Sequence, residues 1–491
     1  MKPIWMLIPV ILPMLGGLAL AAPGLRLARA RNAFTLVITL LSSVCALPLT
    51  LYPPDTALTL VRLSEELTIA LRIDGLSRIY TLIIALLWPV TAVYAFDYMH
   101  KEEHLNRFFG FFLASYGIAA GIAFAANLVT MYLFFELLTL ATLPLVMHRM
   151  DDAARFAAKR YLIFSMTGAA LGLIGVVFCA HYGWPADFTP GGVLRPDKIL
   201  GHEAQLRLAW VLAFFGFGVK AALLPLSVWL PTASVAPTPV TALLHAVAVV
   251  KAGVFACIRL TQYSFGTALL LGTAAQKIVL CAVVLTIVTG SLLALRNNHL
   301  KRRLAWSTVA NLSYILLGVA LMTDAGLLAA SQHMLNHAFI KIALFFAVGI
   351  MMERAKCAYV DELEGLSRRL PVTFACFVIA ALALIGVPPM PGFFSKWAIG
   401  VAAAETGTAL GIAGVIALML SAVLTALYLI TVIIPAYFPL RQVHSVEGAR
   451  LESRGMTGAL LVCTVAVVAL GLFSGSVRTL LAQWLLGGGV K

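Results

Sequence analysis

The sequence predicts an all-α polytopic membrane protein with about 14 transmembrane helices. Of its 491 residues, 61% are hydrophobic and only 11% are charged, and the mean hydropathy is +0.97. Uninterrupted apolar runs of about 20 residues, the length of helix that crosses a bilayer core, recur along the chain. Soluble globular proteins do not combine this size with this composition.

The predicted spans follow the apolar runs from one end of the chain to the other. In order they cover residues 4–23, 33–52, 75–97, 109–126, 128–147, 160–181, 209–229, 240–261, 277–295, 304–322, 328–352, 372–402, 409–438 and 457–475. The first run lacks a cleavage site of small residues followed by a polar chain, so we expect a retained helix and not a signal peptide. Residues 477–491 are expected to form a short interfacial helix.

The distribution of basic residues predicts an orientation. With both chain ends placed outside, most of the 35 lysines and arginines fall in loops on the inner side of the membrane. This asymmetry follows the positive-inside rule, so we expect both termini outside. The net charge of +14 is then explained by anchoring at the cytoplasmic face, and we expect no nucleic-acid partner.

The sequence offers no visible site for a cofactor. Its seven cysteines form no C-x-x-C pair, which argues against iron–sulfur, zinc or haem ligation by thiolates. No glycine-rich nucleotide-binding motif opens a helix. We therefore expect no cofactor and no metal in this chain, and any redox chemistry would take place in a partner.

Two predicted helices are interrupted by prolines. Span seven is broken at Pro225, and span twelve at Pro388, Pro389 and Pro391. Each is the fourth helix of a group of five, spans 4–8 and spans 9–13, and an odd number of helices inverts the second group relative to the first. Paired broken helices in such repeats point to a transport site. The predicted divisions are residues 1–108 (helices 1 to 3), 109–262 (first repeat), 263–438 (second repeat) and 439–491 (helix 14 and tail).

Glu136 and Lys220 are the first candidate pair of intramembrane charges. A charge at a helix centre costs roughly 2.5–3.5 kcal/mol on insertion scales, so it needs a partner or a pathway. Glu136 is the one acidic residue deep in a predicted span, and we expect it to pair with Lys220. A buried lysine whose carboxylate partner moves can act as a proton switch. The alternative is a static ion pair that fixes helix register.

Lys251 is the second candidate, in the middle of span eight. No acidic residue lies near it in the sequence, so we expect a role in transport. His245 precedes it by six residues, about 240° around a continuous helix, so the two should not share a face. His245 is either a transport group or a neutral buried imidazole with one hydrogen bond.

Three titratable residues form a stripe on span eleven. His333, His337 and Lys341 are spaced four residues apart, which places them on one helix face. Such a stripe in an apolar helix favours a proton relay with intervening water. Structural hydrogen bonding is one alternative. A metal site at the two histidines is another, but no H-E-x-x-H glutamate and no third ligand lie nearby.

The remaining basic residues in the spans are Lys396, Arg78 and Arg259. Lys396 follows the break in span twelve, where freed carbonyl groups and water can solvate an ammonium group, as they can beside Lys220. Arg78 and Arg259 lie near span ends, and we expect their side chains to extend to the membrane interface.

Several segments resemble the antiporter-like subunits shared by respiratory complex I, Mrp-type cation/proton antiporters and membrane-bound energy-converting hydrogenases. The longest is FGFGVKAALLPLSVWLPTASVAPTPVTALLHAVAVVKAGVF, residues 215–255. Further matches are DGLSRIY (74–80), LFFELLTLATLPL (133–145), HMLNHAFIKIALFF (333–346) and GVPPMPGFFSKW (386–397). The resemblance covers about spans 3 to 13.

The resemblance implies fourteen helices, two inverted five-helix units and a polar axis at mid-membrane linked to half-channels toward each face. The family's charged positions map onto Glu136, Lys220, Lys251, Lys396, His333, His337 and Lys341. A lysine at position 396 is more similar to L-, N- or Mrp D-type chains than to M-type chains. Ser227, Thr232 and Ser234 stand where family members often carry histidine or acidic residues.

Residues and resemblance together predict a proton-translocating subunit of a redox-driven, multi-subunit complex, either a hydrogenase or complex I-like. Lys251 would exchange protons with the cytoplasmic side and Lys396 with the outside. A D-type subunit of an Mrp Na⁺/H⁺ antiporter is the alternative; an independent solute carrier or a scaffold explains the titratable residues less well. We expect other membrane subunits, a peripheral Fe–S or Ni–Fe redox arm and the lipid bilayer as partners, in a bacterial or archaeal inner membrane.

Overall fold

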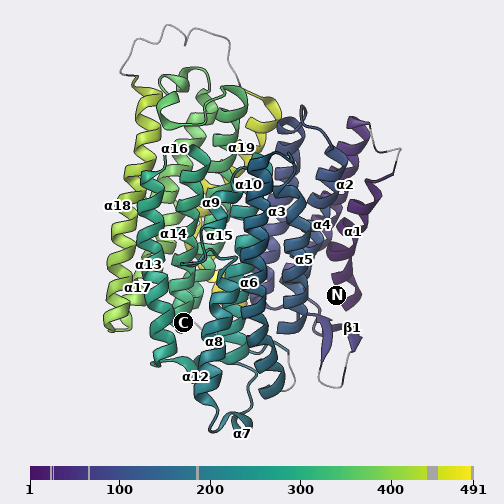
Figure 1. Cartoon of the computed structure of the whole chain (residues 1–491), viewed down its shortest axis with the longest axis vertical. Helices are drawn as coiled ribbons and strands as arrows, with labels where there is room; N and C mark the ends of the chain where they lie inside the picture. Colours follow the sequence, from purple (N-terminus) through teal and green to yellow (C-terminus); the bar gives the residue numbers. More distant parts are fainter. Residues whose placement is uncertain are drawn as a thin grey trace.

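The computed structural model of the chain is a bundle of helices that run mostly along the long axis of the molecule (Figure 1). It describes residues 1–487 except 23–24, 26, 63, 65–66, 184–186 and 440–451. Residues 440–451 and 488–491 of the predicted C-terminal division therefore lie outside the described residues. The predicted all-α membrane fold is confirmed, with one short antiparallel hairpin added by β1 (Leu58–Arg62) and β2 (Thr68–Leu71).

The first half of the chain, up to residue 270, forms the helices from η1 to α12. They are η1 (Pro3–Met6), α1 (Leu7–Ala19), α2 (Ala28–Leu51), α3 (Gly75–Tyr98), α4 (Leu105–Phe124), α5 (Leu128–Val146), α6 (Asp152–Tyr182), α7 (Pro196–Ile199), α8 (Glu203–Gly218), α9 (Trp229–Ala233), α10 (Thr238–Ala246), α11 (Val249–Ile258), the π-helix η3 (Arg259–Phe265) and α12 (Thr267–Leu270).

The second half continues the bundle away from α1 and α2 and then returns (Figure 1). Its helices are α13 (Ala274–Arg296), α14 (Leu300–Ala320), α15 (Asp324–Arg354), η4 (Val360–Glu362), η5 (Leu366–Arg368), α16 (Pro371–Ile385), α17 (Pro391–Glu405), α18 (Ala409–Tyr437), α19 (Arg454–Leu472) and α20 (Ser474–Leu486). The tail helix α20 packs on α3 and α15.

Ten helical stretches of the described residues are long and apolar enough to cross a membrane, with α10, α11 and η3 together forming one of them. Two shorter apolar helices are Pro3–Ala19 and Pro371–Ile385. Helices α8, α14 and α17 coincide with predicted spans but are not among these. The count of fourteen spans therefore stays a prediction.

Polar side chains begin several of the long helices. Asp74, Asn127 and Asp151 each precede a helix and accept a hydrogen bond of 2.7–2.9 Å from a backbone N–H of its first turn. The first N–H groups of a helix have no partner within the helix, and a side-chain oxygen supplies one. These caps fix where α3, α5 and α6 start.

Both predicted interruptions are present. Helix α8 ends at Gly218 and α9 begins at Trp229, while α16 ends at Ile385 and α17 begins at Pro391. A third interruption, between α10 and α11 at residues 247–248, was not predicted. The backbone carbonyl of Ala248 accepts a 2.9 Å hydrogen bond from the Ala252 N–H at the start of α11 and a second one, also 2.9 Å, from the Tyr80 hydroxyl of α3.

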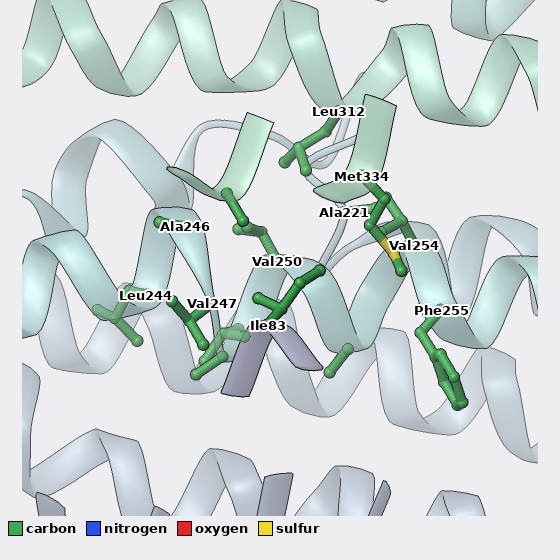
Figure 2. Close-up of a cluster of buried hydrophobic side chains, with 14 of the residues drawn as sticks. Ile83, Ala221, Leu244, Ala246, Val247, Val250, Val254, Phe255, Leu312 and Met334 are labelled. Atoms are coloured by element: carbon green, nitrogen blue, oxygen red, sulfur yellow. The ribbon is translucent and has the colours of Figure 1, made fainter. Parts of the chain in front are cut away.

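The core of the bundle surrounds this third interruption. Figure 2 shows Val247 and Val250 packed among apolar side chains of α3, α14 and α15, including Ile83, Leu312 and Met334. Helix α15 lies at the centre of the bundle, and its most apolar stretch is completely buried. The stretch formed by α10, α11 and η3 is buried to the same extent, so the titratable residues of spans eight and eleven lie on the two most enclosed stretches among the described spans.

Candidate functional site

Lys220 lies at the first interruption and reaches Glu136 on α5. Its Nζ is 3.6 Å from Oε1 of Glu136, and it also donates to the backbone carbonyl of Phe135. Its ammonium group lies 3.5 Å from the centre of the Phe135 ring. Lys220 is fully buried, whereas 22% of the Glu136 side chain is exposed. An ammonium group in this apolar setting is thus balanced by a carboxylate, a carbonyl and a ring face.

The main chain at Lys220 is held against the helix that carries Lys251. A Cβ added at Gly253 would come within 2.3 Å of the Ala221 nitrogen and 2.6 Å of the Lys220 carbonyl carbon. Only glycine allows two backbones to approach so closely. The first interruption therefore packs directly on α11, two residues from Lys251.

Lys251 contacts the central helix through His337. Its Nζ lies 2.6 Å from Nδ1 of His337, and both residues are completely buried. Among the described residues, no carboxylate lies within ion-pair distance of Lys251. The partner of this amine is a titratable ring and not a fixed charge.

The other residues of the span-eleven stripe reach different neighbours. His333 shares a 2.9 Å hydrogen bond through Nδ1 with Ser395 of α17, next to Lys396. Lys341 donates to the carbonyl of Leu304 at 3.0 Å and to the hydroxyl of Ser307, both on α14. The ring centres of His333 and His337 lie 5.9 Å apart. The described residues contain no group of three or more His, Cys, Asp or Glu side chains placed to hold a metal ion.

Lys396 is held by the end of the helix that precedes its own. It donates to the backbone carbonyls of Leu384 and Ile385, at 2.5 and 3.1 Å. These carbonyls belong to the last turn of α16, which ends at the second interruption, so the break supplies the oxygens that the ammonium group needs. Lys396 also lies 5.2 Å from the centre of the Tyr314 ring.

His245 lies on α10, on the other side of the third interruption from Lys251. Its Nε2 is 3.4 Å from the hydroxyl of Ser234, and its ring packs 4.8 Å from that of Phe345 on α15. The angular separation expected for a continuous helix does not apply, because α10 ends at Ala246 and α11 starts at Val249. The premise of a continuous helix was wrong, so the angular argument does not place these two residues relative to each other.

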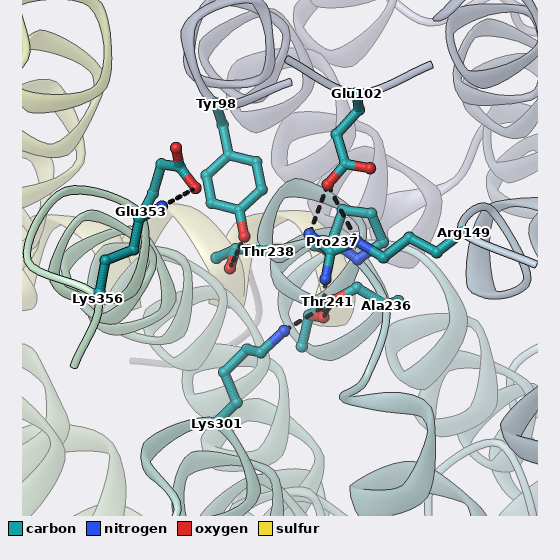
Figure 3. Close-up of polar contacts among 10 residues, drawn as sticks. All are labelled: Tyr98, Glu102, Arg149, Ala236, Pro237, Thr238, Thr241, Lys301, Glu353 and Lys356. Carbon is teal, nitrogen blue, oxygen red and sulfur yellow. Dashed lines mark hydrogen bonds and ion pairs between the residues drawn. The ribbon is translucent and has the colours of Figure 1, made fainter. Parts of the chain in front are cut away.

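A polar cluster lies where α10 and α14 begin and α3 and α15 end (Figure 3). Lys301, which sequence reasoning placed in a loop, is buried and donates to the Ala236 carbonyl at 2.8 Å. Thr241 donates to the same carbonyl at 3.0 Å, and Thr238 donates to the Tyr98 hydroxyl at 3.1 Å. Thr241 lies one turn before His245, so the cluster continues into the core along α10.

Arg259 is paired inside the protein, which the sequence did not predict. It is buried and donates twice to the Asp74 carboxylate, once at 2.7 Å, and to the Ser77 hydroxyl at 2.9 Å. Its guanidinium also lies over the rings of Phe188, Phe255 and Tyr263. Asp74 caps the start of α3, and this position lies beside the end of α11, where Arg259 begins the next helical segment. Asp74 and Arg259 are far apart in the sequence, so the pair could not be recognised before the fold was known.

We call the row of polar residues from Lys220 through Lys251 and His337 to Lys396 the axis. Several buried polar atoms along or beside this axis have no hydrogen-bond partner among the described residues. They include Nε2 of His333, Nε2 of His337, Nδ1 of His245 and the hydroxyl of Ser227. Buried polar atoms are normally satisfied, and water can satisfy such groups. The axis thus combines titratable groups with free hydrogen-bonding positions between them.

Two family models match the chain. The model described as NADH:quinone oxidoreductase/Mrp antiporter, TM, matches residues 125–429. The model described as NADH-Ubiquinone oxidoreductase (complex I), chain 5 N-terminus, matches residues 63–109. The first covers more than half of the chain and contains Glu136, all four lysines of the axis and its three histidines.

Individual relatives agree with these models. NADH-quinone oxidoreductase subunit N of Desulforudis audaxviator is 32% identical over 436 residues, which are 85% of each protein. Hydrogenase-4 component B of Escherichia coli is 32% identical over 351 residues, 68% of this chain and 51% of that protein, so the chain spans about half of the hydrogenase relative. A chain of the Mrp complex from Dietzia sp. DQ12-45-1b shares the fold, with a TM-score of 0.83, 20% identity and 98% coverage of both chains.

Proposed function

Since this chain belongs to the NADH:quinone oxidoreductase and Mrp antiporter family of membrane subunits, we propose that it carries protons across the membrane as one subunit of a larger complex. The observation that supports this most directly is the 2.6 Å contact between Lys251 and His337. An amine and an imidazole that share a hydrogen bond in a completely buried site can pass a proton between them.

The proposed route uses the polar groups in their spatial order. Protons enter from the cytoplasmic side at the polar cluster of Figure 3 and follow α10 to His245. Lys251 and His337 receive them, and His333 with Ser395 leads on to Lys396. Movement of Lys220 toward or away from Glu136 changes the positive potential beside Lys251, so the groups titrate together.

The complex that we propose is redox-driven, either a hydrogenase or complex I-like assembly, in the inner membrane of a bacterium or archaeon with both termini outside. Relatives named as subunits of an NADH-quinone oxidoreductase and of a hydrogenase support this. The chain itself would bind no cofactor, and other membrane subunits with a peripheral Fe–S or Ni–Fe arm would supply the driving reaction. Purifying the complex and identifying its subunits tests this assignment.

A D-type subunit of an Mrp Na⁺/H⁺ antiporter is the second candidate. The whole-chain likeness to a chain of an Mrp complex favours it. The two assignments make opposite predictions about purification. An iron–sulfur or nickel protein among the co-purified subunits supports redox drive, and small membrane proteins alone support the antiporter.

Replacement of Lys251 tests proton transport itself. In the complete complex reconstituted into vesicles, Lys251→Ala should lower proton transport by about tenfold or more, the scale on which single proton-transfer groups act. Lys277→Ala is the matched control, because Lys277 is exposed at the start of α13. Full transport by the Lys251 variant would reject the proposal.

A further inference from the structure

Two stripes of uncharged polar residues face each other between α14 and α18. On α14 the stripe is Ser307, Asn311 and Tyr314, and on α18 it is Ser421, Thr425 and Tyr428. Both have the i, i+4, i+7 spacing that lines one helix face. We call these six residues the hydroxyl seam, because five of them carry hydroxyl groups.

The two stripes run antiparallel and meet at both ends. The Tyr314 hydroxyl is hydrogen-bonded to the Ser421 hydroxyl. At the other end the Tyr428 hydroxyl faces Ser307 and donates to Thr425 at 3.3 Å. The Thr425 side chain lies between these contacts and also faces Tyr314. Two hydrogen bonds, Tyr314 with Ser421 and Tyr428 with Thr425, thus lie along the seam, and each of the six residues is at most 1% exposed.

The seam begins and ends at buried lysines. Lys341 donates to the Ser307 hydroxyl at one end. At the other end, the Tyr314 ring lies 5.2 Å from the Lys396 ammonium group. The centre of the Tyr314 ring also lies 5.5 Å from that of His333. The seam therefore ends beside the route from His337 through His333 and Ser395 to Lys396, which we call the histidine branch.

Structural hydrogen bonding alone does not account for this arrangement. Serine and threonine in a buried helix satisfy themselves by bonding to the carbonyl four residues earlier, as Thr425 does to Ser421 at 2.6 Å. Packing two helices in a membrane needs at most a few small or polar residues. A row of buried hydroxyl groups that extends from one buried ammonium group to another is more than such packing needs.

We propose that the hydroxyl seam is a second proton route, between Lys341 and Lys396, parallel to the histidine branch. A hydroxyl both donates and accepts, so a proton given to Ser307 by the Lys341 ammonium releases the proton of Ser307 to Tyr428, and so on to Tyr314. One water molecule, or rotation of the Lys396 side chain, completes the transfer to the neutral Lys396 amine. Lys341 ends neutral and Lys396 charged, and no hydroxyl carries a lasting charge.

The test removes single hydroxyl groups from the seam in the complete complex, and it rests on the proposed function of proton transport. Tyr428→Phe and Ser421→Ala should each lower transport in vesicles by up to about tenfold, less than a sole relay would, because the histidine branch remains. Either change combined with His333→Asn should lower the transport rate by a larger factor than the two single factors multiplied together, because both parallel routes are then blocked. Ser421→Thr keeps a hydroxyl at this position. This variant should therefore transport protons at a rate close to that of the unchanged protein, unlike Ser421→Ala.

A second pair of buried hydroxyls provides the matched control. Tyr116 and Ser43 are hydrogen-bonded at 3.1 Å between α4 and α2, away from the axis. Tyr116→Phe and Ser43→Ala should leave transport unchanged at equal amounts of assembled complex. If the seam variants transport like these controls, the seam serves only in packing and the proposal is overturned. If one seam variant does not assemble, the other decides, and full transport by Lys251→Ala would overturn the proposed function instead.

Discussion

Gly253 lies directly against the main chain of Lys220, so that an added Cβ would come within 2.6 Å of the Lys220 carbonyl carbon. Backbone atoms cannot move aside as the end of a flexible side chain can. Gly253→Ala should therefore displace the interruption that positions Lys220 and cost at least the roughly 1–3 kcal/mol of an overpacked core. The midpoint temperature of unfolding in detergent and the rate of proton transport should both fall. Gly458→Ala is the control, because nothing lies within 4 Å of a Cβ there.

His337→Asn separates hydrogen bonding from proton transfer at Lys251. The asparagine amide places a polar atom close to the position of Nδ1 and keeps a contact with Lys251, but it does not titrate. Transport should fall by about tenfold or more while the thermal midpoint stays near that of the unchanged protein. His100→Asn, at an exposed histidine, should change neither quantity. Equal transport by the His337 variant would show that the imidazole only supports Lys251.

The Asp74–Arg259 pair should contribute to folding. Arg259→Gln leaves the Asp74 carboxylate partly buried without its cation, a loss of about 3–5 kcal/mol in comparable pairs. Asp74→Asn should also destabilise, and the double variant should recover part of the loss because no unpaired charge remains. Chemical unfolding in detergent measures the cycle. The exposed pair of Arg195 and Asp197 should contribute far less by the same measurement, because water and salt screen it. Additive effects at Asp74 and Arg259 would contradict the coupling.

Stability should depend on pH through two histidines next to helix ends, His148 after α5 and His299 before α14. Burial, with the nearby Arg107, lowers the pKa of His148 from 6.5 to about 4, and burial with Lys301 lowers the pKa of His299 to about 4. Between pH 4 and 6.5 the unfolded chain binds protons that the folded chain does not. The thermal midpoint should therefore decrease as the pH falls from 6.5 to 4, and this contribution should be constant above 6.5.

His148→Gln isolates that effect, because glutamine cannot take up the proton. The variant should show a shallower decrease between pH 6.5 and 4 than the unchanged protein. A profile that is identical with and without His148 would show that other groups produce the acid dependence.

Much of the fold and of the axis could be predicted because their signals are local in the sequence. Prolines mark the breaks near Lys220 and Lys396, and a charged residue in an apolar run is conspicuous. The break at Val247 and Ala248 has no such signal, since neither residue is a helix breaker and the Tyr80 hydroxyl that binds the Ala248 carbonyl comes from another helix.

The features that were missed depend on contacts between distant segments. Arg259 and Lys301 were assigned to a span end and a loop, and their burial follows from Asp74 and Ala236 on other elements. The hydroxyl seam was missed because serine, threonine and tyrosine barely change the hydropathy of a helix. The i, i+4, i+7 spacing on residues 307–314 and 421–428 was the available signal. The inverted relation of the two repeats and the roles of the site residues stay predictions.

The buried lysines differ in the kind of partner that holds them. Lys220, Lys301, Lys341 and Lys396 each donate to a peptide oxygen, which neither gains nor loses a proton, and Lys220 and Lys341 have Glu136 and Ser307 as further partners. Lys251 instead faces an imidazole at 2.6 Å. Two positive charges at that separation repel strongly in a buried site, so arrival of a proton on one ring or amine expels the proton from the other. If the chain transports protons as proposed, this pair would hold a single positive charge, and transport at this position would be limited to one H⁺ per cycle.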